Sequence, residues 1–198
     1  MASTSFLAFA SGATVALAAM HVIQKRRRAN PWISRHVLPN GTGVTVRSAR
    51  ADDVPVIYRM TRDLAILCDE LHDLIETEEG MVQSFTRGGF DALVLETAEG
   101  VVAMAIFQES YRTWSGLSLY LQDLIVSPSC RGCGMGTLVF KVLSAIALAR
   151  GCDRLFWEST VDNHKAHRFY SATIGAKHCT ELLTWKLAGR ERLVALSN

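Results

Sequence analysis

Net charge is nearly absent from this chain: 21 Lys and Arg residues against 19 Asp and Glu residues leave a formal charge of +2 over 198 residues. Nucleic-acid-binding proteins present a strongly basic face, so this composition gives no support to a DNA or RNA partner. Four basic residues stand together at 25–28, and without their four charges the rest of the chain would carry −2. With 49% hydrophobic and 20% charged residues, a fully disordered chain is excluded, and the length suits one domain with an appendage.

Cysteine is also sparse, with five residues at irregular spacings. An odd count without a regular pattern argues against a disulfide framework and favours a reducing compartment. Cys130 and Cys133 have the spacing of half a zinc site or of a redox pair, but no second Cys or His pair follows at metal-ligand spacing. We therefore expect no metal centre.

Charged residues are missing altogether from the segment 3–24, in which apolar and small residues dominate. This is about the length that a helix needs to cross a bilayer. The basic run 25–28 follows directly, and the positive-inside tendency would keep it in the cytosol with everything downstream. A secretory signal would carry its positive charge ahead of the apolar stretch. We expect residues 1–28 to be an apolar membrane helix with a basic flank. The alternatives are a disordered or helical tail of modest hydrophobicity on a cytoplasmic protein, and a cleaved organellar targeting peptide.

Residues 29–43 contain two Pro, two Asn and two Gly, which predicts a linker, and the folded domain should then span 44–198. Val56, Met60, Leu64, Leu67 and Leu71 recur at the spacing of one helical face, and Pro55 suits a first helical turn. Changes of hydrophobic period predict the order strand, two helices, three strands, helix, strand, helix, strand, which is a mixed α/β fold around a central sheet. The expected ranges are 44–48, 52–71, 77–88, 91–97, 101–111, 117–126, 134–150, 153–159, 163–174 and 177–187.

A glycine-rich loop, Arg131-Gly132-Cys133-Gly134-Met135-Gly136-Thr137, follows the third of those central strands and opens the long helix. Glycine lets phosphate oxygens approach the main chain, and the N–H groups and dipole of a helix N-terminus favour an anion. The spacing fits neither the Rossmann fingerprint nor the P-loop, which needs Gly-Lys-Ser/Thr. By itself such a loop is also compatible with a tight turn that binds nothing.

Two motifs in order resemble the GNAT superfamily of N-acetyltransferases. Arg131-x-x-Gly134-x-Gly136 is similar to its pyrophosphate-binding signature, and Asn163 with Phe169-Tyr170 and Ile174-Gly175 is similar to its second motif. The likeness covers about 44–187 and implies the GNAT fold, a central mixed, mostly antiparallel sheet flanked by helices. Within the superfamily the chain most resembles the diamine acetyltransferases (spermidine/spermine and thialysine types), through Thr113-Trp114-Ser115-Gly116, the run 119–123 and Trp185.

The resemblance implies acetyl-CoA as co-substrate, direct attack by an amine, and no metal. It implies that a main-chain N–H near Ile125 polarises the thioester carbonyl and that Tyr170 gives a proton to the departing thiolate, since a phenol stays protonated at neutral pH; a core aromatic is the alternative for Tyr170. The residues implied to bind the co-substrate are Leu124, Ile125, Val126, Arg131, Gly132, Cys133, Gly134, Met135, Gly136, Thr137, Asn163 and Tyr170. Those implied to contact the acceptor are Trp114, Gln122, Asp123 and Trp185.

Two positions depart from the diamine acetyltransferase pattern. Gln122 takes the catalytic place of a glutamate, and an amide cannot accept a proton at neutral pH. Asp123 is adjacent, but strict alternation along a strand would send it to the opposite face. Arg112 stands where an acidic residue would attract a polycation. Either another carboxylate (Glu70, Asp73 or Glu158) or a water chain then acts as the base, or the acceptor amine itself has a lower pKa.

The acidic run after the first helix forms either a rim for an amine or a solvated face; it comprises Glu70, Asp73, Glu76, Glu78 and Glu79. We expect an enzyme that acetylates a primary amine of a small molecule, either a diamine or polyamine or an amino-acid side chain. The alternatives are a protein N-acetyltransferase and a membrane-tethered acyl-CoA-binding protein without catalysis. Superfamily members often dimerise, so a homodimer is a further expectation.

Overall fold

The computed structural model describes residues 32–180, 184 and 186–197. The expected membrane helix at 1–28 and the acceptor residue Trp185 lie outside these residues. Among the helices that are described, none has the length and apolar character needed to span a bilayer. The chain divides into two compact units, residues 1–160 and 161–198, and each is described by itself.

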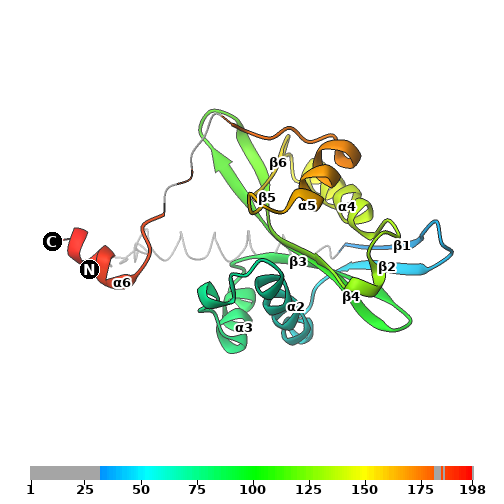
Figure 1. Cartoon of the computed structure of the whole chain (residues 1–198), viewed down its shortest axis with the longest axis horizontal. Helices are drawn as coiled ribbons and strands as arrows, with labels where there is room; N and C mark the ends of the chain where they lie inside the picture. The colour runs from blue at the N-terminus through cyan, green and yellow to red at the C-terminus, as the bar shows by residue number, and fades with distance from the viewer. Residues whose placement is uncertain (1–31, 181–183, 185, 198) are drawn as a thin grey trace, which may run out of the picture. The chain divides into compact units, whose positions relative to one another are not determined.

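The first unit is built on a mixed sheet whose strands follow one another in chain order, β1 to β6 (Figure 1). All neighbouring pairs from β1 to β5 are antiparallel, and only β6 pairs with β5 in parallel. The predicted mixed, mostly antiparallel sheet is therefore confirmed. The strands are β1 (Ile33–Val37), β2 (Gly43–Ser48), β3 (Asp91–Thr97), β4 (Gly100–Arg112), β5 (Gly116–Val126) and β6 (Leu155–Trp157).

Strand β1 lies inside the segment 29–43, for which the sequence predicts a linker. It pairs with β2 along its whole length, and two main-chain contacts extend the pairing: Ser48 donates its N–H to the Trp32 carbonyl at 2.8 Å, and the Trp32 N–H donates to Ser48 Oγ at 2.9 Å. Its alternation of exposed and half-buried side chains is typical of an edge strand. The linker prediction failed here because the turn-forming residues of the β1–β2 hairpin dominate the composition of the segment.

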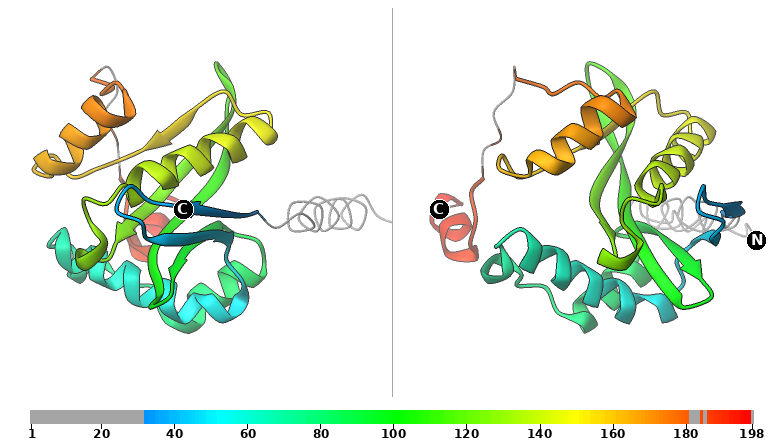
Figure 2. Two further views of the ribbon diagram at one scale, coloured as in Figure 1. Left: turned by 90° about the vertical axis from the view of Figure 1, so that its right-hand side faces the viewer. Right: turned by 45° about the vertical axis from the view of Figure 1, so that its right-hand side comes forward.

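Helices cover both faces of the sheet (Figures 1 and 2). Helices α2 (Val54–Leu67) and α3 (Glu78–Thr86) pack on one face, and α4 (Met135–Ala149) packs on the other, where the Phe140 ring lies 4.9 Å from that of Trp157. The α2–α3 face holds an apolar core to which the two helices and strands β3, β4 and β5 contribute: Val54, Ile57, Met60, Met81, Phe85, Ala92, Val94, Met104, Ile106 and Ile125.

The buried stripe of α2 agrees with the predicted one only in part: Met60 is buried and Val56 and Leu64 are half-buried against the same core, but the rest differs. Val54, Ile57 and Met60 are buried, whereas Leu67 is exposed and Leu71 lies beyond the helix in a short 3-10 turn, η2 (Leu71–Asp73). Both stripes are apolar, so periodicity alone does not select between them; packing against the sheet does. The second predicted helix is confirmed as α3, where Thr77 caps the start by accepting the Gly80 N–H at 3.1 Å.

The second unit contains α5 (His164–Arg168), which continues directly into a π-helical turn, η4 (Phe169–Ile174), and a C-terminal helix, α6 (Arg190–Leu196). Gly175 ends the π-helical turn with φ +74°, as a C-terminal glycine should. A strand is predicted over 177–187, but the described residues of that segment are not in a strand. The apolar residues of the segment satisfy the pattern for a strand, but residues 177–180, 184, 186 and 187, which the structure describes, form no strand.

Candidate active site

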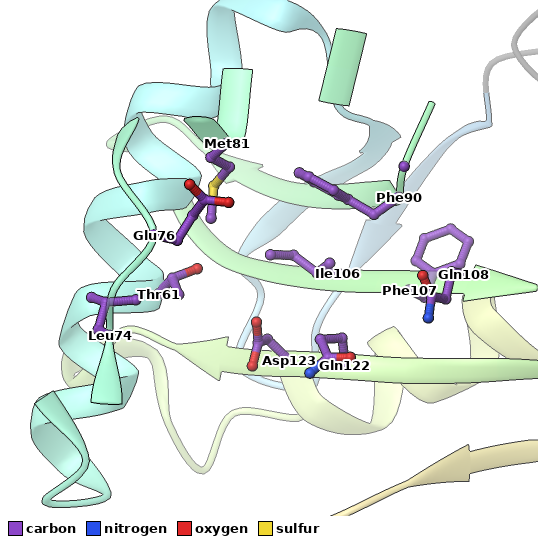
Figure 3. Close-up of a pocket in the computed structure, with 11 residues that line it drawn as sticks. Thr61, Leu74, Glu76, Met81, Phe90, Ile106, Phe107, Gln108, Gln122 and Asp123 are labelled. Carbon is purple, nitrogen blue, oxygen red and sulfur yellow. The ribbon is translucent and has the colours of Figure 1, made fainter. Parts of the chain in front are cut away.

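A β-bulge interrupts the ladder between β4 and β5. Asp123 pairs with Ile106 and Leu121 pairs with Phe107, so Gln122 is an extra residue without a partner on β4. An inserted residue resets the side-chain alternation of its strand. The expectation that Asp123 and Gln122 face opposite sides is therefore wrong: both side chains rise from β5 into the same pocket (Figure 3).

This pocket lies on the α2–α3 face of the sheet and has a volume of about 370 Å³. The volume is near the lower end of the range for small-molecule sites. Neither Lys nor Arg nor His occurs among its lining residues in the described part of the chain, while two carboxylates do, so it suits a small cation. The lining consists of Thr61, Leu74, Glu76, Met81, Gly89, Phe90, Ile106, Phe107, Gln108, Gln122 and Asp123.

The two carboxylates of the pocket differ in their surroundings. Burial raises the pKa of Asp123 above its ordinary value, and no other cause contributes. Glu76 is exposed at the opposite wall, and its Oε1 accepts the N–H of Thr77 at 2.9 Å. Beside them on β5, burial and then the carboxylates of Glu158 and Asp123 raise the pKa of the Tyr120 phenol. The site is therefore acidic and partly desolvated.

The outer edge of β5 is open beyond the pocket. β6 pairs with β5 only at 119–121, although β5 continues to Val126. Ser127 donates its N–H to the Val102 carbonyl at 2.8 Å, and main-chain groups alternate in direction along an antiparallel ladder. The main chain of Ile125 is thus directed at β4, and that of Leu124 and Val126 points away from it. Consistently, the Val126 carbonyl accepts the Nε–H of Arg131 at 2.9 Å.

The glycine-rich loop follows this open edge and leads into α4, as predicted. A short 3-10 turn, η3 (Pro128–Cys130), precedes it, and Gly132 and Gly134 adopt φ +79° and +97°, a region that favours glycine. Gly134 is the N-cap of α4 and has no side chain that could cap the helix. It therefore supplies no side-chain acceptor for the first N–H groups of α4. A Cβ on Gly132 would meet no atom within 4 Å, which leaves its main chain accessible. The cradle fits a diphosphate group.

The Cys133 thiol is hydrogen-bonded inside the glycine-rich loop. Its Sγ donates to the carbonyl oxygen of Cys130 at 2.7 Å, within the turn itself. The described residues contain no group of three or more His, Cys, Asp or Glu side chains that could hold a metal ion.

Residues of the second motif lie in the second unit. The Asn163 side chain caps α5 by accepting the Ala166 N–H at 3.1 Å. Tyr170 is half-buried in the π-helical turn, with its ring 5.6 Å from that of Phe169. π-helical turns are rare and occur frequently at functional sites, which makes the position of Tyr170 notable.

Several residues that the sequence singles out are not in the pocket lining. Trp114 is fully exposed in the turn between β4 and β5, and the Arg112 guanidinium lies 4.1 Å from the centre of the Phe156 ring. Of the acidic run, only Glu76 lines the pocket. Sequence reasoning in turn missed the walls formed by Thr61, Phe90 and Gln108, because these residues lie far apart in the chain and carry no motif.

Comparison with known proteins identifies the family. Residues 59–176 match the acetyltransferase (GNAT) family. The thialysine N-epsilon-acetyltransferase of Mus musculus is 34% identical over 151 residues, which cover 71% of this chain and 88% of that protein. The Bos taurus enzyme of the same name is 32% identical over 153 residues, 72% of this chain and 89% of that protein.

Solved structures agree in fold. An aminoglycoside acetyltransferase from an uncultured soil metagenomic sample, in complex with trehalose, superposes with a TM-score of 0.62 at 16% identity, covering 73% of this chain and 97% of that one. Acetyltransferases of this family use acetyl-CoA, which carries a diphosphate. The chain belongs to the GNAT family and is an N-acetyltransferase of that type.

Proposed function

We propose that the protein transfers the acetyl group of acetyl-CoA to a primary amine of a small cationic molecule, either a diamine or polyamine or an amino-acid side chain. The observation that carries the proposal is the pocket on the α2–α3 face, which contains two carboxylates and no cationic side chain in its described lining. An ammonium group entering this pocket is attracted by both Glu76 and Asp123.

The size of the pocket supports a small acceptor over a protein chain. About 370 Å³ accommodates a short aliphatic amine with its functional groups. Phe90 and Phe107 supply apolar surface for methylene groups, and the amides of Gln108 and Gln122 supply hydrogen-bonding groups. The mammalian relatives named for thialysine, an amino acid with an amine at the end of its side chain, agree with this class of acceptor.

Different parts of the chain bind the co-substrate, polarise its thioester carbonyl and donate a proton. The main chain of Gly132 and Gly134, the first turn of α4 and Arg131 bind the diphosphate. The N–H groups of Leu124 and Val126, which point away from β4, hold the pantetheine arm and polarise the thioester carbonyl, a role that the sequence alone had assigned near Ile125. Tyr170 supplies the proton that the departing thiolate takes up.

Membrane attachment is a separate proposal that rests on sequence alone. The uncharged segment 3–24 and the basic run 25–28 together match a membrane helix with a cytosolic flank. The acetyltransferase domain would then face the cytosol.

Two measurements on the full-length protein test the enzymatic proposal. Calorimetry with acetyl-CoA should show saturable binding at one site per chain. A thiol-release assay should then show turnover with members of a panel of lysine-like amino acids, diamines and polyamines, and none with a peptide whose only amine is its N-terminus. Binding without turnover of any amine would favour a coenzyme A thioester-binding protein instead, and absence of binding would remove the proposal entirely.

A further inference from the structure

Acetyl transfer to an amine requires that a proton leave the nitrogen. An alkyl ammonium ion has no free electron pair, so a nearby group must accept a proton before or during attack. Gln122 lines the pocket, but its side chain is an amide, which cannot accept a proton at neutral pH. The chain therefore needs another proton acceptor within reach of the same pocket.

We infer that Asp123 is the proton acceptor of this enzyme, brought into the pocket by the β-bulge at Gln122. The inference rests on the proposed function. Without the bulge, Asp123 would share the face of Leu119 and Leu121; with it, Asp123 pairs with Ile106 and lines the α2–α3 pocket beside Gln122 (Figure 3). The inserted residue thus places a carboxylate beside Gln122 on the pocket face of β5.

The Asp123 carboxylate has no competing partner among the residues that the structure describes. Within the described residues it makes no hydrogen bond and no ion pair, and no cationic side chain lines the pocket. A partly buried carboxylate that is not satisfied by the protein is costly, and such groups mark functional sites. Desolvation also raises its pKa, which makes it a stronger base than an ordinary aspartate.

The other carboxylates are worse placed. Glu76 is exposed at the far wall and accepts the N–H of Thr77, which suits a role in attracting a second cationic group of the acceptor. Glu158 is exposed and interacts with the Tyr120 phenol, and it does not line the pocket. Helices α2 and α3 and strand β4 contribute no charged side chain to the described lining. The titratable groups around Asp123 are therefore Glu76, which lines the pocket, and Tyr120, whose phenol pKa is raised in part by Asp123.

The position along β5 also fits the chemistry. Asp123 immediately precedes Leu124, whose N–H points away from β4 at the open edge, so the base and a carbonyl-polarising donor come from consecutive residues. A carboxylate oxygen of Asp123 takes one proton from the ammonium group, directly or through one water. The free electron pair then forms the N–C bond, the C–S bond breaks with its electrons on sulfur, and the thiolate takes a proton from Tyr170. Asp123 releases its proton to solvent, and the second amine proton passes through water to the Tyr170 phenolate, so the products are the amide, the free thiol and one proton.

The experiment compares Asp123→Asn with Glu76→Gln and with Asp63→Asn, a surface control on the exposed side of α2. Steady-state thiol release is measured on full-length protein from pH 5 to 9, with an amine that the wild type acetylates. We expect Asp123→Asn to lower kcat by about 100-fold or more while leaving the KM for acetyl-CoA unchanged. In the plot of kcat/KM against pH, the decrease on the acid side, the acid limb, should be set by Asp123 in the wild type. In Asp123→Asn this decrease should move to the pKa of the amine itself. Glu76→Gln should raise the KM for the amine and keep the limb, and Asp63→Asn should behave as wild type.

A weakly basic acceptor gives an independent readout. Trifluoroethylamine is largely neutral at pH 7, so it needs little help in losing a proton before attack, and the gap between wild type and Asp123→Asn should shrink about tenfold or more. A variant that merely misfolds would show no such rescue.

The outcomes separate cleanly. If Asp123→Asn raises only the KM for the amine and retains kcat and the acid limb, Asp123 is a charge partner and the inference is wrong. If Glu76→Gln loses the limb instead, Glu76 is the base. Wild-type protein that binds acetyl-CoA but acetylates no amine would reject the proposed function, and this inference with it, whereas an active wild type with an equally active Asp123→Asn rejects the inference alone.

Discussion

Asp123 pairs with Ile106 across the bulge, on the side of the sheet where Ile106 is buried in the apolar core. Burial raises the pKa of Asp123, so the folded state favours the protonated carboxyl. The free energy of unfolding therefore contains a contribution from Asp123 that is fully present at pH values below the unfolded pKa of this group. The contribution is lost as pH rises through the higher folded pKa.

Asp123→Asn should therefore raise the thermal unfolding midpoint at pH 7, because the amide resembles the neutral acid, and the gain should shrink toward pH 4. Circular dichroism melts of full-length protein at both pH values measure this. Asp63→Asn, on the exposed side of α2, should show no such pH-dependent gain. A lower midpoint for Asp123→Asn at pH 7 would mean that the carboxylate is satisfied in the fold.

Gly132→Ala should weaken acetyl-CoA binding about tenfold or more. The added methyl group projects into open space at the loop, where it blocks the approach of phosphate oxygens, and the φ of +79° also costs an alanine roughly 1–2 kcal/mol. Calorimetry with acetyl-CoA measures the affinity, and thermal melts measure the stability.

Gly100→Ala is the matched control for Gly132→Ala. Gly100 adopts φ +109° in the β3–β4 hairpin and also has no atom within 4 Å of its Cβ position, so the substitution should cost similar stability without changing acetyl-CoA affinity. Equal affinity losses in both variants would show that backbone strain, not access to the loop, causes the effect.

Tyr170→Phe should lower kcat about 100-fold, because it removes the proposed proton donor and keeps the ring. The affinity for acetyl-CoA should change little. Tyr111→Phe, on the exposed end of β4, is the control and should retain wild-type turnover. Unchanged turnover in Tyr170→Phe would show that Tyr170 is not the proton donor and that its ring only packs against neighbouring residues.

Asp53→Asn should destabilise the first unit by roughly 2–3 kcal/mol at neutral pH. The Arg47 guanidinium contacts both Asp53 oxygens at 2.7 and 2.8 Å and also binds Glu96, and all three side chains are at least half-buried.

Hydrogen bonds from Arg47 hold the pKa of the Asp53 and Glu96 carboxyls below their ordinary values of 3.8 and 4.5. Their stabilisation is therefore present above about pH 5 and is lost as pH falls below those values. Urea unfolding at pH 7 and pH 3 should show a large difference between wild type and variant at pH 7 and a small one at pH 3.

Carbonate extraction of full-length protein tests the membrane proposal. With residues 3–24 as a membrane helix, the protein should remain in the pellet. Introducing lysine at Val15 and Leu17 should release it, because charged side chains near the middle of a helix disfavour insertion. Recovery of the unsubstituted protein in the supernatant would contradict the proposal.

Much of the first unit could be predicted because its signals are local. The turn before Gly100 marks the β3–β4 hairpin, Thr77 begins α3, and Gly134 and Gly151 delimit α4. The loop 131–137 was identified for the same reason: positive φ at defined positions requires glycine, and the residues that create the diphosphate cradle are consecutive. The sequence reasoning failed for the end of the α2 stripe at Leu67 and Leu71, for the edge strand β1 and for the predicted strand at 177–187. Each of these depends on which neighbour is available to pack or pair.

By itself, the sequence determined the order of the central strands along the chain, the position of the glycine-rich loop and the likeness to the GNAT family. All three depend on residues that lie close together in the sequence. Only the tertiary structure decided that Asp123 joins Gln122 and Glu76 in one pocket. A bulge is defined by the register between two strands, and neither β4 nor β5 alone records which of its residues goes unpaired.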